Sequence, residues 1–147
     1  NDAFFGSHSN LILPNRAPTM GDGWETRRKR VLPGFDWIIV ELGAPAKIKF
    51  IEVDTNHFKG NFPDSGLIEG CFIPSSVSQH LQPLDFHRPN EFKFVEILPQ
   101  VKFQASHQHY YEEKQLTNTN EVVTHIRMKI FPDGGISRLR MYGEVQL

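Results

Sequence analysis

The stretch DWIIVELGAPAKIKFIEV, residues 36–53, decides the fold of this 147-residue chain. Apolar side chains occupy every second position over residues 36–42, which is typical of a strand with one face in a core. A Gly-Ala-Pro turn signal follows at residues 43–45. Residues 47–54 return to a strand-like composition, so the stretch predicts two strands joined by a turn.

Other short segments rich in β-branched and aromatic residues predict the remaining strands. They cover residues 66–73, 92–98, 101–106, 124–131 and 136–145. The two segments that flank Pro99 form either two strands or one bent strand. Ten prolines oppose long elements. One short helix is predicted from Asp22 to about Lys29, because Asp22 and Glu25 have the spacing of an N-cap and its N3 partner. We therefore expect an all-β, antiparallel β-sandwich.

The composition predicts a single globular domain over residues 1–147. A formal net charge of −1 gives no strong attraction to nucleic acid or to an anionic membrane, so neither is an expected partner. No apolar run approaches the length that spans a bilayer. Cys71, the only cysteine, lies among apolar residues and is expected to be a buried thiol. The chain begins at Asn1 rather than Met, so we expect a piece of a longer protein.

Longer motifs resemble known families at two levels. Residues 36–53 and the segment HIRMKIFPDGGISRLRMYGE, residues 125–144, resemble strands of galactose-binding-like, discoidin-type jelly rolls. A more specific resemblance is to the allantoicase family. It rests on the segments MGDGWETRRKR (residues 20–30), IEVDTNHFKGNFPDS (residues 51–65), IFPDGGISRLRMYG (residues 130–143) and GSHSNLILPNRA (residues 6–17).

The resemblance implies a fold, an activity and partners. The implied fold is a galactose-binding-like jelly-roll β-sandwich. The implied activity is hydrolysis of allantoate to ureidoglycolate and urea in purine breakdown. Allantoicases carry two such domains in tandem, and this chain is similar to the second, so a companion repeat is an expected partner. A homo-oligomer and a cytoplasmic location, with the peroxisome as alternative, are also expected.

The polar loop after residue 53 supplies the first candidate site residues. Asp54, Asn56, His57 and Lys59 offer an acceptor, an amide, an acid or base, and a cation within a short span. We predict Asp54 and His57 as catalytic and Asn56 and Lys59 as substrate-binding. Alternatively, Asp54 and Asn56 cap a turn in which Gly60 takes a positive φ, and the other two side chains are solvated.

The segment at residues 20–30 supplies further candidates. Because Arg binds a carboxylate with two parallel hydrogen bonds, Arg27 or Arg28 is predicted to hold the substrate carboxylate. Glu25 is predicted as a base or as an acceptor for ureido N–H groups. The alternative is a capping box at Glu25 with a solvated basic face.

His107 and His109 form a His-x-His pair at the end of a predicted strand. Residues two apart in a strand share a face, so both rings are weak candidates for one metal ion, with His109 also a catalytic candidate. A third ligand could be Asp54, His57 or Glu112. The alternative is two exposed histidines that bind no metal. The proposed chemistry permits a divalent metal without requiring one.

Four cations are predicted to point outward from the last two long strands: Arg127, Lys129, Arg138 and Arg140. If these strands pair, the cations need carboxylates, a ligand or another subunit, and Arg138 and Arg140 are predicted to bind substrate. If the strands lie in separate sheets, the cations are simply solvated.

Two other functions fit the same fold. One is a non-catalytic ligand- or carbohydrate-binding module, with Trp24, Phe58 and Phe62 as exposed aromatic residues. The other is a structural repeat that supports a companion domain in which turnover takes place.

Overall fold

The computed structural model describes residues 1–82, 85–86 and 92–147. Its strands are β1 (Trp24–Glu25), β2 (Asp36–Asp54), β3 (Ser65–Cys71), β4 (Val95–Lys102), β5 (Gln108–Tyr111), β6 (Val123–Phe131), β7 (Gly135–Ile136) and β8 (Arg138–Val145). Short helical turns are α1 (Ser75–Ser78) and the 3₁₀ helices His8–Ile12, Met20–Asp22 and Glu113–Gln115. The expected antiparallel jelly-roll β-sandwich is confirmed.

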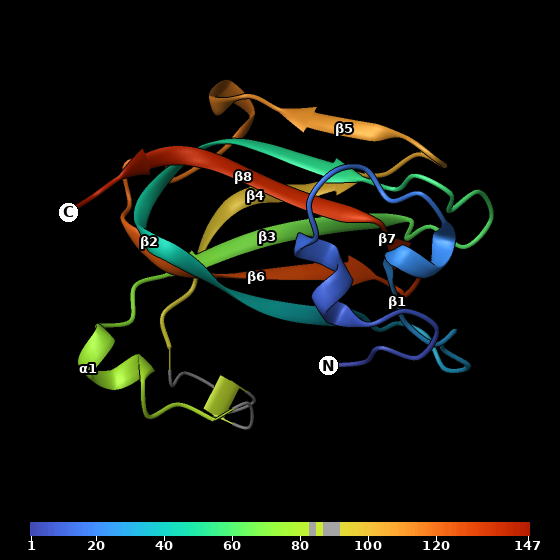
Figure 1. The fold of residues 1–147 in the computed structure, drawn as a ribbon, viewed down its shortest axis with the longest axis horizontal. Helices are drawn as coiled ribbons and strands as arrows, with labels where there is room; N and C mark the ends of the chain where they lie inside the picture. The colour runs from blue at the N-terminus through green and yellow to red at the C-terminus, as the bar shows by residue number, and fades with distance from the viewer. Residues whose placement is uncertain (83–84, 87–91) are drawn as a thin grey trace.

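β2 connects the two layers of the sandwich. Its first part, residues 36–41, pairs with β6, which continues through β3 to the edge strand β4. Its last part, residues 46–54, pairs with β8 on one side, and residues 51–54 pair with β5 on the other. Figure 1 shows β2 curving at the left of the molecule from beside β6 to beside β8. The core lies between the layers and contains Ile68 and Met128 from one and Ile51 from the other.

Two irregularities shape β2. The predicted turn at residues 43–45 is wrong, because the strand runs through it with a shift of register between Glu41 and Ala46. A second shift lies further on, where Ile48 pairs with Gly143 and Phe50 pairs with Tyr142. Gly143 and Tyr142 are consecutive in β8, so Lys49 is an extra residue of β2 between their two partners, which is a β-bulge.

The predicted helix at residues 22–29 is also wrong. Trp24 and Glu25 form β1, which pairs with β7, and the backbone N–H of Thr26 donates to the carbonyl of Gly134 at 3.0 Å. The indole ring of Trp24 is fully buried. Burial of this side chain and pairing with β7 outweigh the local helix-start signal, as tertiary contacts commonly do.

The other strand predictions have mixed outcomes. The segments at residues 92–98 and 101–106, predicted as two strands or one bent strand, form the single strand β4, which tolerates Pro99 because it is an edge strand with an irregular register there. The strand predicted over residues 136–145 is divided at Ser137 into β7 and β8. β5 is a strand that the sequence did not predict. Cys71 is buried as expected, and burial raises the pKa of its thiol to about 11.

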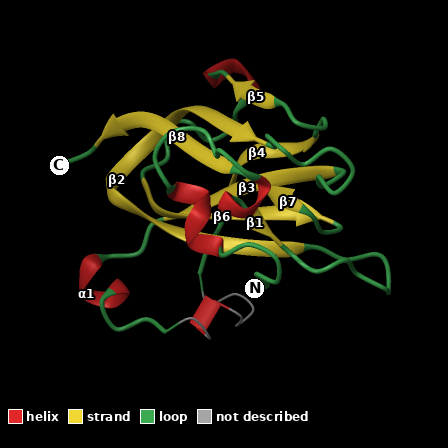
Figure 2. Ribbon diagram, turned by 45° about the vertical axis from the view of Figure 1, so that its right-hand side comes forward, coloured by secondary structure: helices red, strands yellow, loops and turns green. Residues whose placement is uncertain are grey.

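The N-terminal segment covers part of the outer face of the β8 layer. The 3₁₀ helix His8–Ile12 contacts β8, and Leu11 enters the core. In Figure 2 the short helices of this segment lie in front of the strands, while α1 lies apart from the sandwich. Among the described helices, none is long and apolar enough to cross a membrane.

Candidate functional site

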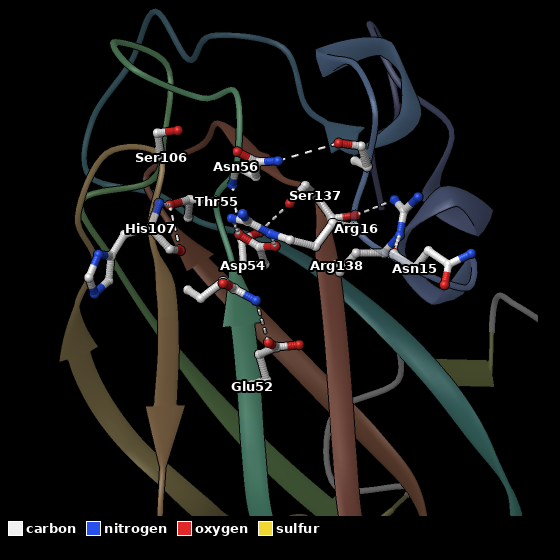
Figure 3. Close-up of polar contacts among 12 residues, drawn as sticks. Asn15, Arg16, Glu52, Asp54, Thr55, Asn56, Ser106, His107, Ser137 and Arg138 are labelled. Carbon is white, nitrogen blue, oxygen red and sulfur yellow. Dashed lines mark hydrogen bonds and ion pairs between the residues drawn. The ribbon is translucent and has the colours of Figure 1, made fainter.

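Asp54 ends β2 and is the centre of the candidate site (Figure 3). Its side chain is 1% exposed. Arg16 donates to both carboxylate oxygens, from Nε to Oδ2 at 2.9 Å and from Nη2 to Oδ1 at 3.2 Å. The backbone N–H of Asn56 also donates to Oδ1, at 2.9 Å. Hydrogen bonding to Asp54 raises the pKa of Arg16 above its ordinary value.

Hydrogen bonds from residues next to the neighbouring strands β8 and β5 hold the backbone around Asp54 in place. Both the N–H and the Oγ of Ser137 donate to the Asp54 carbonyl at 2.8 Å, which explains the break between β7 and β8. Thr55 Oγ1 donates to the Gln104 carbonyl at 2.6 Å and accepts from the N–H of His107 at 3.0 Å. The loop therefore leaves β2 in a defined direction rather than as a solvated tail.

His57 has the most constrained backbone in the loop. Its φ is +74°, in the left-handed region that non-glycine residues seldom adopt, whereas Gly60 was the residue expected to take a positive φ. The conformation brings Nε2 to 2.7 Å from the carbonyl oxygen of Ala17. A carbonyl only accepts, so this contact requires a proton on Nε2, and Nδ2 of Asn56 lies 3.2 Å from the same nitrogen. The structure shows no hydrogen-bond partner for Nδ1 among the described residues.

Arg138 and Arg140 lie on the outer face of β8, as predicted, but neither is simply solvated. Arg138 is 3% exposed and donates to the carbonyls of Asn15 (2.9 Å), Asn10 (3.0 Å), Asp22 (2.5 Å) and Ser137 (2.6 Å). Burial, and then repulsion from Arg140, lowers the pKa of Arg138.

Arg140 contacts the same N-terminal segment. It donates to the carbonyls of Leu13 and Asn15, the latter at 3.2 Å. Both arginines thus hold the segment that carries Arg16. Their predicted contact with substrate is untested and stays a prediction.

Glu52 and Tyr110 extend the site along the same face. Glu52 lies opposite Arg140 on β8 and opposite Tyr110 on β5. Its Oε1 accepts from Gln108 at 2.9 Å. Partial desolvation and a hydrogen bond with Glu52 raise the pKa of Tyr110. Further along, the rings of Tyr110 and Phe50 stack with centroids 6.0 Å apart.

The rings of His107 and His109 lie in edge-to-face contact, with their centroids 4.8 Å apart. The ring of His109 is buried, donates from Nδ1 to the Val53 carbonyl at 2.9 Å and accepts at Nε2 from the Gln104 N–H at 2.8 Å. Burial lowers its pKa, which favours this neutral form. His107 is exposed, and its ring points away from Asp54 in Figure 3. Both nitrogens of His109 are engaged, so the predicted catalytic and metal-binding roles find no vacant ring nitrogen.

The candidates at residues 25–28 belong to a separate group of contacts. Glu25 Oε2 accepts from Asn61 at 2.8 Å, at the far end of the same loop. Arg27 stacks over the Phe4 ring at 4.2 Å from its centroid. Arg28 and Lys59 are exposed. Among the described residues, no hydrogen bond or ion pair joins these side chains to Asp54.

The remaining cations are paired in the other layer. β6 and β8 do not pair with each other, so the four predicted cations divide between layers. Arg127 lies 3.1 Å and Lys129 3.0 Å from the Glu69 carboxylate. Although burial alone would raise the pKa of Glu69, hydrogen bonds from the two cations lower it.

No group of three or more His, Cys, Asp or Glu side chains within residues 1–82, 85–86 and 92–147 is placed to hold a metal ion. A cavity of about 670 Å³ lies over the outer face of the other layer, where Trp37, Ile39 and His125 form part of its lining. None of the predicted site residues lines that cavity. The Asp54 site meets the solvent at Arg16, whose side chain is 49% exposed.

The aromatic residues expected for a sugar platform are not available. Trp24 and Phe58 are fully buried, and Phe62 is half-buried against the core. Gly23 and Gly135 leave the space that the Phe58 ring fills. These aromatic side chains pack inside the protein rather than present a binding surface.

Arg16 is the main residue of the site that sequence reasoning missed. Its segment, residues 6–17, was used for the family resemblance, but no local pattern marks Arg16 as a partner of Asp54, 38 residues away. The available signal was indirect: a buried acid at the end of a strand requires a cation or several donors. That requirement does not say which cation provides the contact.

The chain matches the family model "Allantoicase repeat" over residues 1–146. It is 43% identical over 145 residues to a "Probable allantoicase" of Pseudomonas fluorescens, an alignment that covers 99% of this chain and 41% of the relative. The chain thus spans well under half the length of the curated relatives it matches.

Solved structures agree with this match. The crystal structure of allantoicase from Saccharomyces cerevisiae superposes with a TM-score of 0.77 at 35% identity, covering 97% of this chain and 38% of that one. The C-terminal domain of a chitobiase from Bacteroides fragilis superposes at 0.65 with 16% identity, covering 96% of this chain and 83% of that domain. The second likeness concerns the fold alone.

Proposed function

The chain belongs to the allantoicase repeat family, and from that premise we propose that its parent protein hydrolyses allantoate to ureidoglycolate and urea. The observation that carries the proposal is the family match over residues 1–146. The Asp54 site supports it, because a buried carboxylate, a fixed imidazole and a group of arginines meet at one end of the sandwich.

The reaction requires a defined movement of bonds. The bond between the central carbon of allantoate and one ureido nitrogen breaks, and a bond from that carbon to a water oxygen forms. One water proton passes through a base, and the leaving urea nitrogen gains a proton. The protein must therefore provide a base for water, an acid for urea and cations for the carboxylate.

His57 is the proposed base. The Ala17 carbonyl holds its Nε2–H, so Nδ1 can take a proton from water. Asn56, whose side chain also donates to Ala17 at 3.3 Å, lies beside it as a candidate contact for a ureido arm. Asp54 is proposed to act through the residues it orients, because its carboxylate is buried and already accepts three hydrogen bonds. Glu25 and Lys59 stay as predicted contacts.

A test of the base uses the full-length protein. His57→Gln should lower kcat for urea release from allantoate by roughly 10²- to 10⁴-fold, the usual contribution of general acid–base catalysis. His80→Gln, an exposed histidine outside the site, is the matched control and should keep wild-type turnover. Unchanged kcat in His57→Gln would assign the base elsewhere, and a folded wild-type protein that releases no urea would remove the hydrolase proposal itself.

We further propose that the chain is the second of two repeats and that the companion repeat helps to enclose the site. The support is the half-exposed Arg16 side chain beside the buried Asp54, and the 41% share of the relative that the chain spans. The exposed apolar side chains of Phe4, Phe5, Val31 and Leu32 support contacts with that repeat or with another copy in a homo-oligomer. A cytoplasmic location, with the peroxisome as alternative, stays a prediction.

Measurements on the isolated 147-residue chain distinguish a site within one repeat from a site that needs the companion repeat. We expect it to fold and to show less activity than the full protein, measured as urea release per mole together with mass by light scattering. Equal activity would place the whole site within one repeat. A folded full-length protein active only through the other repeat would support the structural alternative for this one.

A further inference from the structure

The guanidinium of Arg16 is bound along only one of its edges. Nε and Nη2 donate to the two oxygens of Asp54, which occupies the side-on edge of the group. The opposite, end-on edge consists of Nη1 and the second N–H of Nη2. Among the described residues, no acceptor is bonded to Nη1. An end-on edge of this kind matches a carboxylate through two parallel hydrogen bonds.

The position of Arg16 favours a small ligand rather than a structural partner at that edge. Its side chain is 49% exposed, although the carboxylate that it binds is 1% exposed. The ion pair therefore has a buried acidic end and an open basic end. Asp54 fixes the plane of the guanidinium, which reduces the entropy that Arg16 loses when it binds an anion.

Charges of both signs surround this open end. Arg138 and Arg140 donate to main-chain carbonyls of residues 10–22 and of their own strand. Within the part of the chain that the structure describes, neither forms an ion pair with a carboxylate. Glu52 acts electrostatically on Arg16, and Asp22 and Asp54 act on Arg138, so the two arginines add positive charge beside these carboxylates.

We propose that Arg16 binds the carboxylate of the substrate through its Nη1 and Nη2 edge, and that Asp54 is the positioning residue that orients it. The inference rests on the proposed hydrolysis of allantoate, a small carboxylate with two ureido arms. It assigns the carboxylate contact to Arg16, in place of the predicted Arg27 or Arg28. His57 and Asn56, which bond Ala17 next to Arg16, then face the rest of the bound molecule.

The test compares Arg16→Lys and Arg16→Gln with wild type in the full-length protein. Lysine keeps the charge but cannot form the two-pronged contact, so KM for allantoate should rise about 10-fold. Glutamine loses the charge as well, and KM should rise about 100-fold. Arg30→Gln, an exposed arginine outside the site, is the matched control and should leave both constants unchanged.

A second readout separates binding from folding. The neutral carboxamide analogue of allantoate lacks the anion, so wild type should bind allantoate at least 10-fold more tightly than the amide, as measured by competition. Arg16→Gln should reduce that preference toward equality, whereas a purely structural role would weaken both ligands alike. Guanidinium ion added to Arg16→Ala should restore part of the activity.

The outcomes are distinct. A folded wild-type protein that does not hydrolyse allantoate overturns the proposed function and this inference together. Wild-type turnover, combined with Arg16 variants that keep their KM and their preference for acid over amide, overturns the inference alone.

Discussion

Arg138 fixes the N-terminal segment to β8 through its guanidinium. Its four hydrogen bonds all go to main-chain carbonyls, three of them on residues 10, 15 and 22. Arg138→Lys keeps the charge but leaves several of these buried acceptors without donors, so the free energy of unfolding should fall by about 2 kcal/mol. Urea denaturation measures the change, and Arg30→Lys should stay within about 0.5 kcal/mol of wild type. Equal losses for the two variants would contradict the role of Arg138.

His109 should make stability depend on pH. Burial lowers its pKa in the folded state, so the unfolded chain binds the proton more readily. Its contribution is therefore complete above the unfolded pKa of about 6.5 and is lost as the pH falls toward the lower folded pKa. His125, whose pKa is also lowered by burial, acts in the same direction.

The measurement is the urea midpoint of unfolding between pH 7 and pH 5. Wild type should lose stability over this range, and His109→Gln should show a shallower slope because one of the two buried imidazoles is absent. An identical slope in the variant would show that His109 does not control the pH dependence.

At the residue scale, the sequence marked the candidate loop but not its contacts. The crowding of polar residues after β2 correctly marked Asp54, Asn56 and His57 as neighbours. Arg16 escaped notice because its partner is far away in the chain. Arg138 was predicted on the correct face of its strand. The segment that buries Arg138 contacts it through main-chain carbonyls. Because every residue has a carbonyl, no sequence pattern indicates which ones bind Arg138.

At the element scale, the small strands β1 and β7 depend on the absence of a side chain at Gly135. A Cβ at this position would lie 1.9 Å from Cε1 of Phe58. Gly135→Ala should therefore displace the Phe58 ring and lower the free energy of unfolding by about 2 kcal/mol, the usual cost of overpacking a core.

Gly43→Ala is the matched control for this element. Nothing lies within 4 Å of a Cβ at Gly43, so the substitution should change stability by no more than about 0.5 kcal/mol. Circular dichroism melts of the two variants measure the difference. A larger loss at Gly43 than at Gly135 would contradict the packing argument.

Strand prediction succeeded where periodicity extended over several residues. β3 and β6 were found with small errors at their ends, whereas β2 was predicted as two strands and β7 and β8 as one. β1 and β5 are too short for a pattern to emerge, and their pairing with β7 and β2 decides their conformation. The Gly-Ala-Pro segment at residues 43–45 predicted a turn, but pairing on both sides of it preserves a continuous strand.

At the scale of the whole molecule, β2 belongs to both layers, so the layers should unfold together. Trp37→Phe leaves Trp24, which is buried in β1, as the only indole. We expect its fluorescence midpoint in urea to coincide with the midpoint of the far-ultraviolet circular dichroism signal. Two separate midpoints would indicate that the layers are independent units.

The β-bulge between Ile48 and Phe50 determines which set of side chains meets the solvent. Before it, even-numbered residues such as Ile48 face the core; after it, the odd-numbered Ile51 and Val53 do so. Removing one residue here would exchange the two sets and turn the Asp54 carboxylate toward the apolar interior. The orientation of the Asp54 side chain therefore depends on the extra residue in β2. A β2 shortened by that residue would lose the Asp54 site even with every other residue unchanged.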